Sequence, residues 1–100
     1  KSEAATASVS NTIEIALDTS GTYFIAGEQV GSERDQLLNA LRSVVGSLDA
    51  QALSQQPVEI RADASATHQS VVRALDVCAT LGLVRVSLAT APATKTMDPQ

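Results

Sequence analysis

Hydrophobic and polar residues alternate in three short segments, residues 12–17, 57–63 and 83–90. A period of two residues predicts β-strands that each bury one face. Proline is tolerated at the start of a strand, so Pro57 fits the beginning of the second segment. The predicted inward-facing residues are Ile13, Ile15 and Leu17 in the first segment, Val58, Ile60 and Ala62 in the second, and Val84, Val86 and Leu88 in the third.

The DTSG sequence after the first strand predicts a turn. Asp18 can accept hydrogen bonds from the backbone ahead of it, and Gly21 can adopt a positive φ. Residues 22–26 are again strand-like, and a tight reversal at Gly27 leads to a short extended piece at residues 29–30. We therefore expect an antiparallel hairpin followed by a third, brief strand.

Two longer segments have hydrophobic residues three or four positions apart, which predicts amphipathic helices. The first follows the sequence SERD, which we interpret as a capping box formed by Ser32 and Asp35. The second begins between Ser65 and Gln69 and ends at Gly82, a residue typical of a helix C-terminus. The predicted buried stripes are Leu37, Leu38, Leu41, Val44, Val45 and Leu48 in the first helix, and Val71, Val72, Leu75, Cys78, Ala79 and Leu81 in the second.

This order of elements predicts an α+β fold, a two-layer ββαβαβ sandwich with both helices on one face of a mixed sheet. The last strand–helix–strand unit predicts a parallel strand pair. A chain of 100 residues suits one domain, which we expect at residues 12–90, between a flexible linker at 1–11 and a flexible tail at 91–100. Because the chain begins at Lys1, we expect it to be part of a longer protein.

The composition argues against a nucleic-acid partner and against a membrane span within these residues. The formal charge is −4 and the seven Lys and Arg residues are scattered, which disfavours nucleic acid as a partner. Tyr23 and Phe24 are the only aromatic residues, so base stacking is disfavoured as well. No run of about 18 apolar residues occurs, so we expect no membrane span within these residues.

Candidate chemistry centres on Asp63 and His68, at the junction between the second alternating segment and the second helix. With Ser70 they supply the residue types of a hydrolase triad, but side chains two apart on a helix diverge, and no GxSxG sequence is present. Instead, we interpret Asp63 as an acceptor for backbone NH groups of the following loop. Asp76 fits either a solvated helix face or a partner contact.

Neither a cofactor nor a metal site is predicted. The five glycines are dispersed and form no phosphate-binding loop. A metal site needs several ligands that converge, and the sequence has only one histidine and one cysteine. Cys78 lies within an apolar helical pattern, where a thiol behaves as a small hydrophobic group. We therefore expect no catalytic activity from this chain.

Four segments in order, LDTSGTYFIAGEQV, VEIRAD, VVRALD and LGLVRVSLAT, resemble the periplasmic domain of the ExbD/TolR family over residues 12–90. Ala62 and Asp63 match the family's strand ending, and Gly82 matches the glycine before its last strand. Leu75 and Asp76 match a hydrophobic residue followed by aspartate. His68 departs from the family, which usually has a tyrosine there.

The resemblance implies a homodimeric inner-membrane protein with one transmembrane helix and this domain in the periplasm. Such a protein would join an ExbB/TolQ-like subunit in a motor driven by the proton-motive force and energise a TonB- or TolA-like protein. The RAD strand ending favours the ExbD-like branch, which serves TonB-dependent transport. The expected partner-binding residues, with strand addition along residues 83–90, are Asp63, His68, Asp76, Val84, Val86 and Leu88.

Two alternatives remain open at this point. One is a TolR-like subunit of the Tol-Pal envelope-maintenance system that binds peptidoglycan. The other is a cytosolic regulatory or enzymatic domain with the same order of elements. The first shares the fold and the family, whereas the second shares only the pattern.

Overall fold

A computed structural model describes residues 11–90 and shows a five-stranded mixed sheet with three helices. The predicted linker and tail fall outside the described residues, apart from Asn11. The strands are β1 (Ile13–Leu17), β2 (Tyr23–Ile25), β3 (Glu28–Gly31), β4 (Pro57–Ala62) and β5 (Arg85–Thr90). The helices are α2 (Arg34–Val44), α3 (Ala50–Gln55) and α4 (His68–Thr80).

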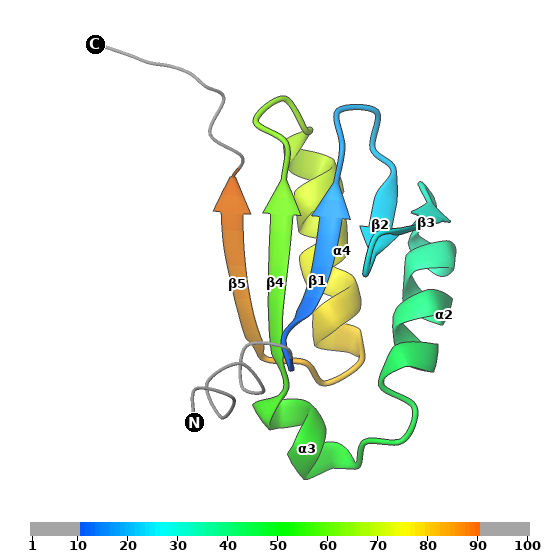
Figure 1. Ribbon diagram of the computed structural model, residues 1–100, viewed down its shortest axis with the longest axis vertical. Helices are drawn as coiled ribbons and strands as arrows, with labels where there is room; N and C mark the ends of the chain where they lie inside the picture. The colour runs from blue at the N-terminus through cyan, green and yellow to red at the C-terminus, as the bar shows by residue number, and fades with distance from the viewer. Residues whose placement is uncertain (1–10, 91–100) are drawn as a thin grey trace, which may run out of the picture.

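The sheet has the strand order β3-β2-β1-β4-β5. β1 pairs antiparallel with β2 and parallel with β4, and β4 pairs parallel with β5. The predicted hairpin, mixed sheet and parallel pair are therefore confirmed. In Figure 1 α4 lies behind β1 and β4, whereas no helix lies behind β5. One face of β5 is consequently left without cover.

The core lies between the sheet and the helices, and it is almost entirely aliphatic. Ile15 of β1 pairs in register with Ile60 of β4, and both side chains are fully buried. Tyr23 is the one aromatic residue of this core. The predicted inward faces of β1 and β4 are confirmed, because Leu17, Val58 and Ala62 are also buried.

The start of α2 differs from the prediction by one residue. The N-cap is Glu33 rather than Ser32, and Gln36 rather than Asp35 closes the capping box. The side-chain oxygen Oε1 of Gln36 accepts from the backbone NH of Ser32 at 3.1 Å and of Glu33 at 3.0 Å. Gly31 has a φ of +132°, which residues with a side chain rarely adopt, and a Cβ there would also displace the Gln36 amide.

The buried face of α4 is also rotated from the predicted stripe. Val72 and Leu75 are 45% and 39% exposed, whereas Ser70 and Ala74 are buried together with Val77 and Cys78. The buried face is centred on Ser70, Ala74, Val77 and Cys78, so the helical period of 3.6 residues places Val72 on the opposite, solvent-facing side of α4. A similar correction applies to Val44 of α2, which is 50% exposed.

Gly82 ends α4 as predicted. Its φ is +86°, and its NH donates to the carbonyl of Ala79 at 3.1 Å. The NH of Leu83 donates to the carbonyl of Cys78 at 2.9 Å, which completes a Schellman motif. The chain thus turns directly from α4 toward β5, with Leu83 buried at the turn.

Two further features differ from the sequence-based expectations. The short helix α3 was not predicted, because its six residues include no apolar stripe; Asp49 caps it by accepting from the NH of Ala52 at 2.9 Å. β5 begins at Arg85, so Val84 precedes the strand and is 69% exposed. The prediction that Val84 lies on the inward face was wrong, and Leu83 occupies the core instead.

Candidate functional site

The outer edge of β5 lies beside two apolar side chains that are more than half exposed, Val84 and Leu88. β5 ends the sheet among the described strands, so one side of its backbone has no strand partner there. Such an edge is a template for pairing with another chain. Leu88 lies in register with Ile60, on the helix side of the sheet, yet it is 52% exposed.

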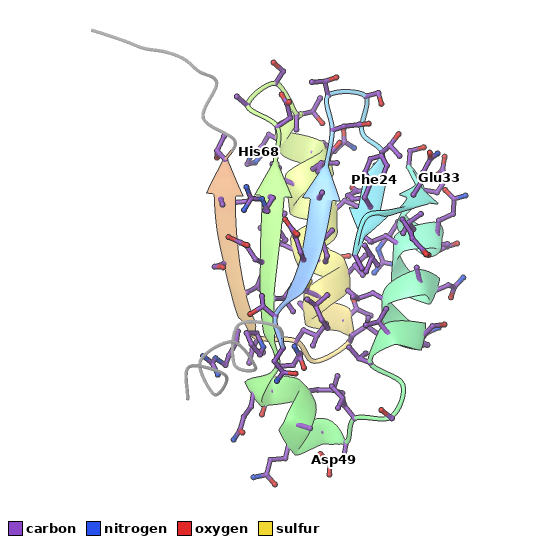
Figure 2. The ribbon with its side chains drawn as sticks, viewed as in Figure 1. Phe24, Glu33, Asp49 and His68 are labelled. Carbon is purple, nitrogen blue, oxygen red and sulfur yellow. The ribbon has the colours of Figure 1, made fainter. Side chains whose placement is uncertain are left out.

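A hollow of about 270 Å³ lies at the carboxyl end of this edge. It brings together three of the predicted partner-binding residues, Asp63, His68 and Leu88. Figure 2 shows His68 near the upper ends of β4 and β5. The other lining residues were not predicted to belong to a site, because they carry no charge or ring that would mark one in the sequence. They are Ala62, Ala64, Ala66, Val71 and Thr90.

A second hollow, of about 490 Å³, lies at the amino end of β5. Val84 and Val86, the other two predicted residues of this segment, line it together with Arg85. The Arg85 guanidinium donates from Nη1 to the carbonyl of Gln55 at 3.2 Å, which ties this end of the strand to α3. The β5 edge is therefore flanked by a hollow at each end.

Asp63 has the structural role predicted for it. Its Oδ1 accepts from the backbone NH of Ser65 at 2.8 Å, and its carbonyl accepts from the NH of Ala66 at 2.9 Å. These bonds shape the loop into Thr67, the N-cap of α4, whose hydroxyl accepts from the NH of Ser70 at 3.1 Å. Because Ser70 is buried and His68 is exposed, their side chains diverge as expected.

Asp76 is not part of this site. Its Oδ2 lies 2.9 Å from Nη2 of Arg34, an ion pair between the exposed surfaces of α4 and α2. Arg34 also donates to the Thr80 hydroxyl at 3.2 Å. These contacts face α2, whereas His68 and Val71 face β5, so the structure separates Asp76 from the other predicted residues.

The sheet face opposite the helices carries a further hollow, of about 300 Å³, that the sequence did not reveal. Phe24 lines it with Ala16 and Arg61, and the three residues are neighbours in register across β2, β1 and β4. Nε of Arg61 lies 3.0 Å from a Glu14 carboxylate oxygen. Asp18 also lines the hollow; backbone hydrogen bonds, above all from Thr22, hold the pKa of its carboxyl below the usual value.

The buried thiol of Cys78 lies in the core, away from these surfaces. Burial raises its pKa to about 11, so the reactive thiolate is disfavoured near neutral pH. Within residues 11–90, no three His, Cys, Asp or Glu side chains gather in a way that could hold a metal ion. None of the helices in this described part has the length and apolar character needed to cross a membrane.

These surfaces are the candidates for contact with another polypeptide, and comparison with known proteins shows the family of the chain. A family profile described as biopolymer transport protein ExbD/TolR matches residues 1–93. The chain belongs to the ExbD/TolR family. The curated proteins include no significant match. ExbD/TolR proteins are associated with biopolymer transport, so the resemblance seen in the sequence is confirmed at the level of the family.

Proposed function

We propose that this ExbD/TolR chain is the periplasmic, non-enzymatic domain of a subunit in an inner-membrane motor driven by the proton-motive force. Within that motor it works as a homodimer beside an ExbB/TolQ-like subunit and docks a TonB- or TolA-like protein. We favour the ExbD-like branch, which energises TonB-dependent outer-membrane transport. Family membership supports the general role.

The observation that carries the docking mechanism is the uncovered edge of β5. An extended segment of the partner would add to the sheet there, because main-chain hydrogen bonds give affinity and alternate side chains give specificity. Val84 and Leu88 are apolar and more than half exposed beside this edge. A pulling force along the added strand would load several main-chain hydrogen bonds together.

An NMR titration tests the mechanism, using short synthetic peptides that tile the periplasmic part of the TonB- or TolA-like protein of the same organism. We expect at least one peptide to shift backbone amides of β5 most strongly. Leu88→Lys should weaken binding about tenfold or more, because a charge beside the edge opposes strand addition. Val44→Lys is the matched control, since Val44 of α2 is exposed to a similar degree. Shifts confined to the helices would contradict strand addition.

A TolR-like role in envelope maintenance is the second candidate. The observation that favours it is the hollow beside Phe24 on the open sheet face, where an apolar ring lies near Arg61 and could contact a peptidoglycan strand. Co-sedimentation with purified sacculi tests this role. Binding that is lost in Phe24→Ala but kept in Leu88→Lys would favour it, whereas absence of co-sedimentation would exclude it for this domain.

A further inference from the structure

The hollow at the carboxyl end of β5 has features of a side-chain pocket that strand addition alone does not require. We propose that it receives one aliphatic side chain of the docked segment and thereby selects the partner sequence. This inference rests on the proposed docking along β5. The occupant is an extended segment with an aliphatic residue opposite Leu88 and a Lys or Arg close to it, toward Asp63.

Five of the eight residues that line the hollow are apolar, and three of those five are alanines. Ala62 and Ala66 contribute only methyl groups, and Val71 of α4 and Leu88 of β5 form apolar walls. A volume of about 270 Å³ has room for one branched or aromatic side chain. Filling it would remove apolar surface of Leu88 from water, which is favourable in proportion to the area covered.

Strand geometry sends a partner side chain toward this hollow. Leu88 lies on the helix side of the sheet, because it pairs in register with the buried Ile60. In paired strands, directly opposed side chains share a face and lie about 5 Å apart at their Cβ atoms. A residue opposite Leu88 therefore has its side chain on the same face as Leu88, at the side of the hollow that Val71 and His68 also line.

The carboxylate of Asp63 favours a basic residue in the docked segment, next to the aliphatic one. The half-buried Asp63 is the one acidic residue among those that line the hollow. The loop that Asp63 organises through Ser65 holds the carboxylate in place, so little side-chain freedom remains to be lost on pairing. A basic side chain of the docked segment would complement this carboxylate and the net charge of −4 on the chain.

A size series at the anchor position tests the pocket. The tightest-binding peptide of the tiled set is first scanned with alanine, and the position that loses most affinity is taken as the anchor. Versions with Ala, Val, Leu or Phe at the anchor are then compared. Their dissociation constants are measured by calorimetry. We expect Leu to bind about tenfold more tightly than Ala. In Ala66→Leu, which fills the hollow, this preference should fall below about threefold, whereas Ala50→Leu on the exposed start of α3 should keep it.

Leu88→Ala enlarges the hollow instead of filling it, and it tests the pocket even if Ala66→Leu does not fold. The enlarged hollow should shift the preference from Leu toward Phe. Peptides that bind and shift β5 amides, but whose size preference is absent or unchanged in both variants, would overturn the pocket and leave strand addition intact. Failure of every tiled peptide to bind would instead overturn the docking itself.

Discussion

The phenol hydroxyl of Tyr23 donates a 2.8 Å hydrogen bond to the backbone carbonyl oxygen of Ser70. The two residues are 47 positions apart, and the bond is buried. It joins the β1–β2 hairpin to the first turn of α4, beside the loop that Asp63 organises. The start of α4, which follows this loop, is therefore anchored to β2, the strand on the far side of β1 and β4 from β5.

Removing this hydroxyl should destabilise the fold. Tyr23→Phe keeps the ring but leaves the Ser70 carbonyl without its second donor in the core, which should lower the free energy of unfolding by about 1–2 kcal/mol. Urea denaturation measures the change. Ser54→Ala is the control, because its hydroxyl donates to the Gln51 carbonyl at an exposed position and should cost less than about 0.5 kcal/mol. Equal losses in the two variants would contradict the role of the buried bond.

Alkaline pH should weaken the fold through Cys78. Its thiol has an ordinary pKa of 9.0, which burial raises to about 11, so folding favours the neutral form. The corresponding stability is present below pH 9 and is lost as the pH rises toward 11. Burial likewise raises the pKa of Tyr23 above 10.0, which adds to the loss at higher pH.

Free energies of unfolding measured across this range should decline, and Cys78→Ala should decline less steeply. A disulfide reagent at pH 8 provides an independent check, because the native thiol should react only through opening of the core. Rapid labelling in the absence of denaturant would contradict the buried, protonated thiol.

The turn between β2 and β3 offers a stabilising change. Ala26 and Gly27 have φ values of 54° and 84°, so both residues are left-handed, as in a type I′ turn. An alanine in this region is strained by about 1 kcal/mol. Ala26→Gly should therefore raise the free energy of unfolding by about 0.5–1 kcal/mol, measured by urea denaturation. Ala40→Gly in the interior of α2 should lower it by about 1 kcal/mol, and a loss in both variants would rule out strain at Ala26.

The sequence predicted most of the fold because its strands and α2 bury one face each. Ile15, Ile60 and Leu41 lie where their periodicity places them, and all three are fully buried. The same reasoning failed on α4, because periodicity counts apolar residues but does not reveal how far the sheet extends beneath a helix. Leu75 is apolar but 39% exposed, whereas Ser70 is polar but buried, and its backbone carbonyl accepts from the Tyr23 hydroxyl.

Part of the candidate site was predictable because local sequence features mark it, and part was not because it depends on contacts between distant segments. Asp63, His68 and Leu88 were selected from the strand–helix junction and the last strand, and the structure brings them into one hollow. Asp76 was selected from the family pattern, but its place depends on which flank of α4 faces α2. That flank follows from how α4 packs on the core, and the partner of Asp76 there is Arg34, 42 positions away, which no local pattern contains.

Substitutions at Asp63 should separate its two roles. Asp63→Ala removes the acceptor for the NH of Ser65 and should lower the free energy of unfolding by about 1 kcal/mol. Asp63→Asn keeps a side-chain oxygen, so thermal or urea denaturation should show less than half of that loss. The charge, however, is gone in both variants, so both should weaken a basic peptide docked at β5, and high salt should weaken the wild type in the same way. If Asp63→Asn is as unstable as Asp63→Ala, the geometry of the loop depends on the charge itself. If Asp63→Asn binds the peptide as tightly as the wild type does, the carboxylate takes no part in docking.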